Sequence, residues 1–440
     1  MKIALIGNMN NNNFALMRYF RDLGADAHLL LYSTDGEDSL RHFRPENDTW
    51  QIEKWSPFIH PTVIPNAPIA AFSAPISWLL YVYSQLGGMI NGKQTHAVRP
   101  VKRHIIYRTY GAYDCLVASG IAPAMLLRIN RNLDLFYPYS TGIEFFNSLH
   151  FTTDTQRNVL KRLIGYEVKR RQSKGIKGAK IRVNAEMSAT KRAFETIGVG
   201  FCNLSVPIVY HESYSSHIIS KISDSMKLMS ILPKTGCLFF HSARIMFEKP
   251  VGSIETNWKN ENKNTDIFMR SFAELLRIRP SAQVHLLIVE YGPDIEAAKS
   301  LVSELEICDH VVWLPKMQRR EVMWFLSQVD LAIGEFIKAP GIIWGGTGWE
   351  ALAVGKPLVQ NFLFEKNDFE NTYGCPSPPI LSVKRDEDIL RHLIFAIENP
   401  EKIRQIGDEA RAWFNRYQGL NLAKKFLDLL KSSSHNTTTS

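Results

Sequence analysis

The chain has 440 residues, 45% of them hydrophobic and 22% charged, which is typical of a globular protein of two or three domains and argues against a disordered chain. Its five cysteines lie far apart without a Cys-x-x-Cys pair, which argues against a disulfide framework or a zinc site and favours a reducing cytoplasm. The net charge of +9 calls for a partner or a structural reason.

Residues 1–206 alternate between strand and helix patterns. The opening run "KIALIG" is too short for a signal-peptide core and predicts a first strand, and the helical spacing of residues 14–24 follows it. Further strands are expected at 26–32, 113–120, 133–142 and 181–185, with a helix over 186–198. Such alternation predicts a parallel, doubly wound sheet, and we assign residues 1–206 to a first Rossmann-like domain.

An asparagine-rich turn joins the first strand to its helix in "GNMNNNNF". Two interpretations stand side by side. Carboxamides can donate to and accept from sugar hydroxyls, and asparagine also tolerates a left-handed turn. The candidate acceptor-side residues in this turn are Asn8, Asn10, Asn11, Asn12 and Asn13.

Two segments of the first domain could contact a membrane surface. Residues 161–182 carry nine Lys and Arg against the single acid Glu167, and residues 55–92 contain no charged side chain other than histidine. An anionic bilayer would attract the first and accept the second in its interface. The alternatives are a solvated helix face and simple burial, and no recognised nucleic-acid module accompanies the basic segment.

A second α/β unit is expected after a Ser- and Pro-containing connection at 207–235. The strand and helix alternation restarts at "CLFFHSA" and continues to about residue 415, which predicts a second Rossmann-like domain over 236–415. A C-terminal helix at 416–431 could cross back to the first domain, and the polar tail 432–440 is expected to be disordered. Two such domains in tandem place their ligand site in the cleft between them.

The stretch "GIIWGGTGWEALAVGKPLV" in the second domain combines a glycine-rich turn with an apolar helix. Gly345, Gly346 and Gly348 would let backbone N–H groups approach a ligand, and Thr347 could cap the helix whose N-terminus favours an anion. Glu350 is expected in the first helical turn, reaching past a diphosphate to a neutral diol such as a ribose. Taken alone, the stretch fits a capped helix as well as a ligand site.

Two cations of the second domain lie next to the ends of its first strand and first helix. Arg244 follows the domain's first strand, and Lys263 precedes its first helix, so both are expected on the cleft side where they could neutralise a leaving diphosphate. The alternative for each is an ordinary exposed cation.

These elements together resemble the GT-B glycosyltransferases, and specifically the large retaining family four. The family order of strand, Gly-Arg, Lys-Gly-x-Asp, Gly-x-Gly-Pro and Glu-Ala-x-Ala-x-Gly-x-Pro appears here as "SAR", "KNTD", "VEYGP" and "EALAVGKP", with "VVWLPK" and "QVDLAIGEF" between the last two. The resemblance covers residues 236–362 well and the N-terminal half in outline. It implies a GT-B fold with two Rossmann-like domains facing across a cleft.

The resemblance also implies residue roles. Arg244, Lys263 and Glu335 would form the catalytic group, with Glu335 near the donor sugar. Donor binding would use the residues Gly292, Leu314, Pro315, Lys316, Gly346, Thr347, Gly348 and Glu350, with Leu314 to Lys316 beside the nucleobase and Glu350 at the ribose.

Three departures from the family pattern stand out. Fourteen residues separate Glu335 from Glu350 where the family has seven, so either the loop is expanded or Glu335 is not the equivalent residue. Asn264 replaces the glycine of "KNTD". Where many members have a catalytic histidine, "YPYSTGIEFF" offers Thr141 and Glu144 as acceptor-side candidates.

The sequence therefore predicts a glycosyltransferase that moves a hexose-type sugar from a nucleoside diphosphate sugar to a glycan or lipid-linked acceptor, with retention. A UDP-sugar is the expected donor, and no further cofactor and no metal are expected, since the only Asp-x-Asp (386–388) opens a predicted helix. The protein is expected in the cytoplasm, with peripheral attachment to the inner face of the cell membrane. The alternatives are a nucleotide-sugar 2-epimerase of the same fold and a non-catalytic sugar-nucleotide or glycan-binding protein.

Overall fold

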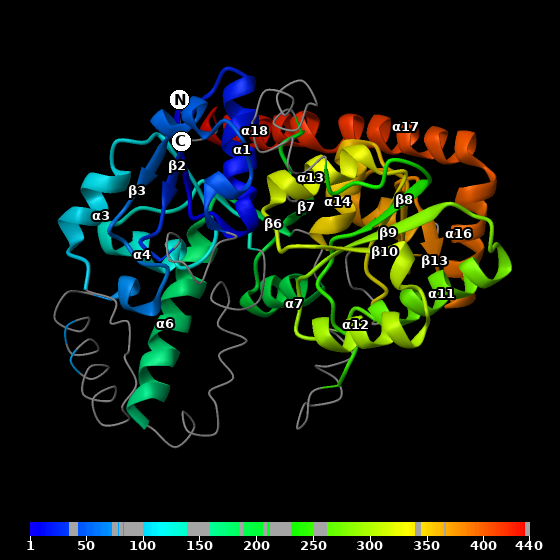
Figure 1. Cartoon of the computed structure of the whole chain (residues 1–440). Helices are drawn as coiled ribbons and strands as arrows, with labels where there is room; N and C mark the ends of the chain where they lie inside the picture. Colours follow the sequence, from blue (N-terminus) through cyan, green and yellow to red (C-terminus); the bar gives the residue numbers. More distant parts are fainter. Residues whose placement is uncertain are drawn as a thin grey trace.

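Two α/β domains lie side by side in the computed structural model (Figure 1), each built on a parallel sheet. The structure describes residues 1–34, 43–72, 78, 82, 100–138, 159–184, 188–205, 209–211, 230–249, 262–338, 345–364 and 367–435. Thr141, Glu144, much of the charge-free run, most of the connection 207–235 and the segment 339–344 lie outside the described residues.

The first sheet has seven parallel strands in the order β3-β2-β1-β4-β5-β6-β7. Its strands are β1 (Lys2–Ile6), β2 (Asp26–Leu31), β3 (Ile59–Pro61), β4 (Cys115–Ala118), β5 (Leu135–Phe136), β6 (Ile181–Asn184) and β7 (Cys202–Asn203). In β1 the residues Ile3 to Ile6 are fully buried, because helices cover both faces of the sheet.

The helices of this domain divide between the two faces of the sheet. Ile3 and Leu5 pack against α1 (Asn12–Asp22) and α18 (Gly419–His435), whereas Ala4 and Ile6 face the opposite layer. That layer consists of α3 (Arg103–Tyr110), α4 (Ala122–Leu126), α6 (Val159–Gly178) and α7 (Ser188–Ile197). The two-residue period of a strand thus sorts β1 into two cores.

The second sheet has six parallel strands in the order β10-β9-β8-β11-β12-β13. Its strands are β8 (Cys237–His241), β9 (Val284–Val289), β10 (Val311–Leu314), β11 (Leu331–Ile333), β12 (Leu358–Asn361) and β13 (Leu381–Val383). One face packs on α11 (Thr265–Ile278), α12 (Ile295–Glu304) and α16 (Glu387–Glu398). The other face packs on α13 (Arg319–Gln328), α14 (Gly346–Val354) and α17 (Pro400–Tyr417).

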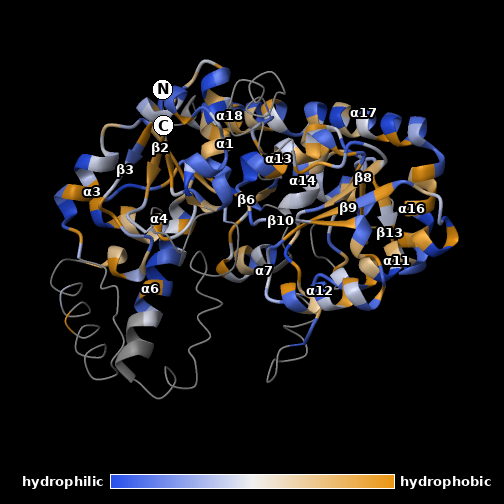
Figure 2. Ribbon diagram, in the orientation of Figure 1, coloured by the Kyte–Doolittle hydropathy of each residue, from blue (hydrophilic) through white to orange (hydrophobic). Residues whose placement is uncertain are grey.

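Short elements complete the described part of the chain. They are α15 (Asp368–Tyr373) and single turns of 3-10 helix at Met9–Asn11, Pro45–Asn47, Ile52–Lys54, Ser56–Phe58, Pro68–Ala71, Leu127–Ile129 and Cys308–His310. Figure 2 shows the strands as a hydrophobic interior and the outer helix faces as hydrophilic, which is the pattern expected of two separate cores.

The last helix returns to the first domain. Leu422, Phe426 and Leu430 of α18 are buried with the residues of α1, so the chain ends on the domain in which it began. The helix continues to His435, and residues 432–435 are therefore not part of a disordered tail, contrary to the sequence prediction. The Ser432 and Ser433 hydroxyls donate to carbonyls of the preceding turn, which satisfies their polar groups within the helix.

The strand orders place a topological switch point in each sheet, between β1 and β4 and between β8 and β11. In open parallel sheets ligands bind outside the carboxyl ends of the strands at this point. Within the described ranges, no helix has the length and hydropathy needed to span a bilayer.

Candidate active site

A cleft of about 810 Å³ opens at the carboxyl ends of the second domain's strands, where that domain meets the first. Asn11 and Asn47 of the first domain line one wall. The other wall is formed by Ser242, Ala243, Arg244, Lys263, Val289, Tyr291, Lys316, Met317, Gln318, Arg319, Val322, Glu335, Gly346, Thr347 and Glu350. Of the cleft residues named from the sequence, eight meet here: Asn11, Arg244, Lys263, Lys316, Glu335, Gly346, Thr347 and Glu350.

Lys263 and Glu335 form an ion pair inside the cleft. The Lys263 Nζ lies 2.7 Å from Glu335 Oε2, and both side chains are largely buried. Asn264 adopts the left-handed backbone (φ 48°) at the start of α11, and its side-chain amide donates to the Phe336 carbonyl at 2.6 Å. Asparagine can therefore replace the glycine of the family pattern, because it tolerates this conformation and ties the Lys263 loop to the Glu335 loop.

Glu335 also lies at the glycine turn, despite the fourteen intervening residues. A Cβ atom on Gly345 would sit 3.0 Å from both carboxylate oxygens of Glu335. The ends of the inserted segment are thus drawn together, and a side chain at position 345 would crowd the carboxylate. Glu335 and Glu350 consequently face the same cleft.

The glycine turn differs in detail from the sequence prediction. Gly345, rather than Thr347, is the N-cap residue of α14. Because glycine has no side chain, it makes no side-chain hydrogen bond to the helix. The helix begins at Gly346, which puts Glu350 in the second turn instead of the first. The N-terminus of α14 nevertheless opens on the cleft through Gly346 and Thr347, while Gly348 is buried and does not line it.

Glu350 belongs to a buried network that joins the two domains. Arg319 donates to Glu350 Oε1 at 2.8 Å, to Asp48 Oδ1 at 3.1 Å and to the Asn10 carbonyl at 2.7 Å. Asp48 is fully buried and also pairs with the fully buried Arg18. Burial raises the pKa of Glu350, and nearby Asp48 and Glu335 add to this, although Arg319 acts in the opposite direction.

Arg320 strengthens the same junction. Its guanidinium donates to the carbonyls of Glu46 (3.2 Å) and Thr49 (3.4 Å) and lies 4.7 Å from the centre of the Trp50 ring. Sequence reasoning missed both arginines. The feature of the sequence that could have found them is their place in the first turn of a helix. Cations there are unfavourable to the helix dipole and so need another partner.

Two further cations face the cleft. Arg244 is half-buried and makes no hydrogen bond or ion pair with any residue that the structure describes, and Lys316 lies 4.9 Å from the centre of the Tyr291 ring. With Lys263 and Arg319 the lining holds four cations against the carboxylates of Glu335 and Glu350. The cleft therefore has the charge expected of a site for an anion.

Besides Gly348, three more of the predicted donor residues do not line the cleft. Leu314 is fully buried in the core of the second domain. Pro315 is exposed beside the opening. A Cβ atom on Gly292 would lie 2.1 Å from the Ile245 carbonyl oxygen, so this glycine (φ 143°) permits two loops to touch rather than contacting a ligand.

The asparagine turn is mainly structural. Asn8 accepts from the Phe14 N–H and donates to Asn11 and to the Phe43 carbonyl, while Asn12 is buried and does not line the cleft. Asn10 and Asn11 have left-handed backbones (φ 51° and 60°). Asn10 is exposed and gives its carbonyl to Arg319, which leaves Asn11 as the turn's side chain in the cleft wall.

The Asp-x-Asp stretch lies at the start of α16 and holds the turn that precedes this helix. Asp388 Oδ2 accepts the backbone N–H groups of Lys384 and Arg385, each at 3.0 Å, and these bonds lower the pKa of Asp388. Among the described residues, no group of three or more His, Cys, Asp or Glu side chains is arranged to hold a metal ion.

Comparisons with known proteins agree on the fold. Neither a protein-family model nor a curated protein sequence matches this chain. A glycosyltransferase from Rickettsia africae superposes with a TM-score of 0.57 at 13% identity, over 99% of each chain. Sucrose-phosphate synthase from Thermosynechococcus elongatus gives 0.54 at 13% over 98% of each chain, and α,α-trehalose 6-phosphate synthase from Burkholderia multivorans gives 0.54 at 11% over 99% of each.

The chain has the GT-B fold. Its two parallel sheets of seven and six strands and its likeness to glycosyltransferases of known structure over nearly the whole chain carry this assignment. At such low identity the likeness extends to the fold and not to the reaction.

Proposed function

We propose that this protein is a glycosyltransferase that uses a nucleoside diphosphate sugar, a UDP-sugar being the expected donor. The observation that carries the proposal is the convergence of Arg244, Lys263, Glu350 and the N-terminus of α14 on one cleft. Cations and a helix N-terminus suit a diphosphate, and a carboxylate beside them suits a neutral diol.

Stabilisation of the leaving diphosphate would be the main catalytic contribution of this cleft. Arg244 has no competing partner in the described part of the chain, and Lys263 can exchange Glu335 for a phosphate oxygen. Charges held in place before the reaction stabilise a developing anion without reorganisation. The proposed reaction needs no metal for this purpose.

The nucleoside would lie along Glu350 and Lys316. Arg319 occupies Oε1 of Glu350, which leaves Oε2 to accept from a ribose hydroxyl. Lys316 and Tyr291 offer a cation and an aromatic ring to the base.

Glu335 would lie at the donor sugar, beside Lys263 and Gly345. We propose transfer of a hexose-type sugar with retention, in which the acceptor hydroxyl attacks from the side of the leaving group. The acceptor would enter past Asn11 of the first domain. Its hydroxyl oxygen would bond to the anomeric carbon as the bond from that carbon to the diphosphate breaks, and the hydroxyl proton would pass to the leaving diphosphate oxygen.

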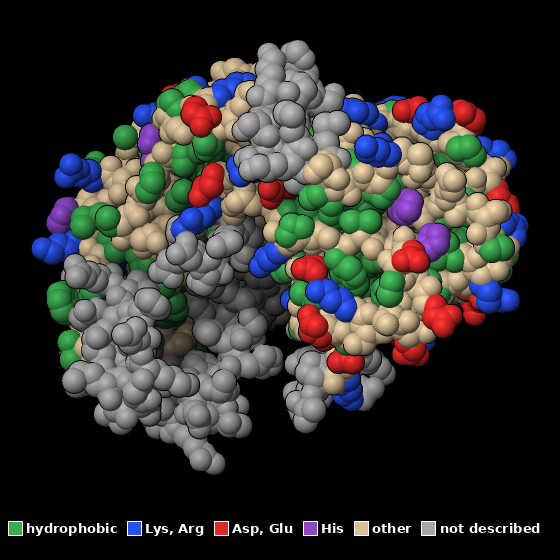
Figure 3. Space-filling view, viewed as in Figure 1, with side chains coloured by type: hydrophobic (Ala, Val, Ile, Leu, Met, Phe, Trp, Pro, Cys, Tyr) green, Lys and Arg blue, Asp and Glu red, His purple; other side chains and the backbone are tan. Residues whose placement is uncertain are grey.

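A lipid-linked acceptor is proposed from the surface of α6. Lys169, Arg170, Lys174 and Lys177 are exposed on this helix, and Tyr166 beside them is 70% exposed. On the second domain, by contrast, acidic and basic side chains intermingle over the visible surface (Figure 3). A basic helix with an exposed aromatic residue suits peripheral attachment to an anionic membrane on the cytoplasmic side.

The proposal is tested first by donor binding. Thermal unfolding is measured with UDP-, GDP- and ADP-sugars, and the products of any stabilising donor are analysed by mass spectrometry. We expect one nucleotide class to raise the unfolding temperature, by an amount that grows with the logarithm of its concentration relative to its Kd. Absence of stabilisation by all three classes would contradict the proposed donor.

A further inference from the structure

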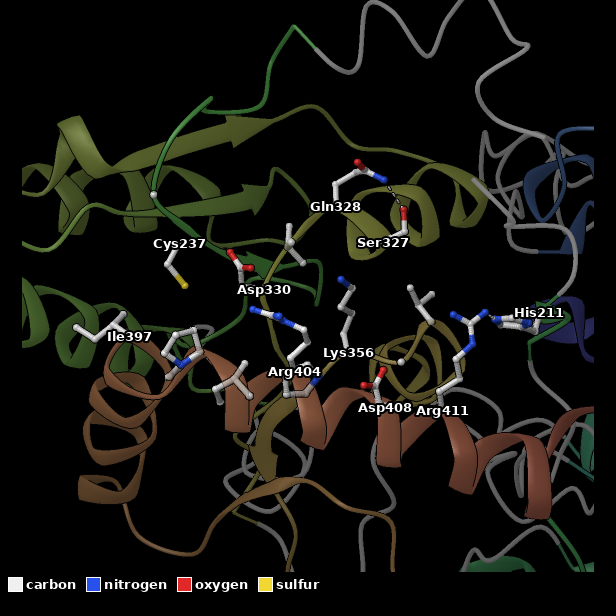
Figure 4. A pocket seen from close by; sticks show the side chains of 18 residues that line it. His211, Cys237, Ser327, Gln328, Asp330, Lys356, Ile397, Arg404, Asp408 and Arg411 are labelled. Atoms are coloured by element: carbon white, nitrogen blue, oxygen red, sulfur yellow. Dashed lines mark hydrogen bonds between the residues drawn. The ribbon is translucent and has the colours of Figure 1, made fainter. Parts of the chain in front are cut away.

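A second cavity, of about 630 Å³, lies at the opposite edge of the second sheet, where β8, β11 and β12 begin. Cys237, Asp330 and Pro357 line it at the starts of these strands. Figure 4 shows Lys356 in the middle of the opening, between Asp330 on one side and Arg411 with His211 on the other. The proposed glycosyl transfer makes no use of this cavity.

Two glycines bring Lys356 and Arg411 together. Gly355 ends α14 with a left-handed backbone (φ 77°), and a Cβ atom on it would lie 3.0 Å from Arg411 Cβ. A Cβ atom on Gly407 of α17 would lie 2.5 Å from the Gly355 carbonyl oxygen. The close crossing of α14 and α17 therefore fixes both cations in one wall.

Neither cation has a carboxylate partner. In the described part of the chain, the Lys356 side chain makes no hydrogen bond or ion pair, and the Arg411 guanidinium donates only to His211 Nε2, at 2.6 Å. Asp330 and Asp408 line the same cavity, but neither lies within 4 Å of a cation there. Lys356 and Arg411 repel each other, and an anion bound between them would remove that cost.

The pKa values of Lys356 and His211 reflect their burial beside Arg411. Burial lowers the pKa of Lys356, and Arg411 lowers it further while the two aspartates oppose the change. Burial and Arg411 lower the pKa of His211 to about 4, so His211 is neutral and can accept the Arg411 bond at pH 7.

We propose that this cavity binds a small phosphate-bearing compound, whose phosphate contacts Lys356 and Arg411. Arginine and lysine are the usual phosphate ligands of proteins, and Arg411 keeps further N–H donors beyond the one given to His211. Val354, Pro357 and Ile403 supply an apolar wall for the carbon part of a phosphate monoester. The volume is within the range of small-molecule sites.

The test separates this cavity from the active-site cleft. Thermal unfolding is measured in inorganic phosphate and in glucose 6-phosphate at constant ionic strength, in an Arg244→Gln/Lys263→Gln background that disables the cleft. Lys356→Gln and Arg411→Gln are each added to this background, and Lys402→Gln, an exposed lysine of α17 outside the cavity, is the control. Comparing the two ligands shows whether the cavity binds free phosphate or a phosphate monoester.

We expect at least one of the two ligands to stabilise the background protein, with an affinity that falls about tenfold or more in Lys356→Gln and in Arg411→Gln and stays unchanged in Lys402→Gln. No stabilisation of the background by either ligand, or equal affinities in all three variants, would overturn the proposal. Because the cleft is disabled throughout, the outcome does not depend on the proposed transferase activity.

Discussion

Glu350 has two tasks at once, since it anchors Arg319 through one oxygen and would bind the ribose through the other. Replacing it by alanine removes a charged hydrogen-bond acceptor from the donor site. We expect Glu350→Ala to weaken nucleotide binding about 10- to 100-fold in calorimetric titration. Glu296→Ala, at an exposed position on α12, is the control. Unchanged affinity in Glu350→Ala would remove Glu350 from the donor site.

Histidine titration makes stability depend on pH. Burial lowers the pKa of both His211 and His241 to about 4, below the ordinary value of 6.5. The unfolded chain therefore binds protons that the folded chain excludes, so this stability is present above pH 6.5 and is lost as the pH falls towards 4. We expect the unfolding temperature of His211→Gln to fall less between pH 7 and pH 5 than that of the wild type. Equal losses would show that His211 does not titrate in this way.

At the scale of elements, the N-terminus of α13 holds the domains together. Arg319 carries the bonds to Glu350 and Asp48, and both carboxylates stay buried when it is removed. We expect Arg319→Met to destabilise the protein by about 3 kcal/mol, since Glu350 is left buried without its cation while Asp48 keeps Arg18. Arg277→Met, at an exposed pair on α11, should leave stability nearly unchanged, because solvent screens that pair. Similar midpoints of urea unfolding in the two variants would contradict the network's role.

The order of strands and helices in both domains could be predicted because periodicity and glycine stops are local. Side-chain contacts across the cleft could not be predicted in this way. Asp48 follows an ordinary turn in the sequence, and its burial between Arg18 and Arg319 depends on how the domains meet. The ion pair of Lys263 with Glu335 likewise joins loops that lie 72 residues apart.

The glycine turn shows the same limit within one element. Its sequence predicts a helix start and an anion site, but not that Gly345, which lies beside the Glu335 carboxylate, is the N-cap instead of Thr347. Short strands such as β7 and β13 escaped prediction because two or three residues carry too little periodicity.

At the scale of the whole molecule, the basic surface of α6 predicts membrane attachment. We expect the protein to sediment with anionic vesicles at low salt and to be released as salt rises. Replacing four exposed cations of α6 should weaken binding about 100-fold or more. Those are Lys169, Arg170, Lys174 and Lys177, and the control replaces Lys402, Arg416, Lys424 and Lys425. Equal binding of the two quadruple variants, or none by the wild type, would contradict attachment through α6.

Transfer itself is the central claim, and the mass of the products tests it most directly. The stabilising donor is incubated with membrane lipid and glycan acceptors in the presence of EDTA, and the products are analysed by mass spectrometry. We predict free nucleoside diphosphate together with an acceptor heavier by one sugar residue, both formed about 100- to 1000-fold more slowly by Lys263→Ala. An isomerised sugar still attached to its nucleotide, or a bound donor that never releases its nucleoside diphosphate, would contradict it.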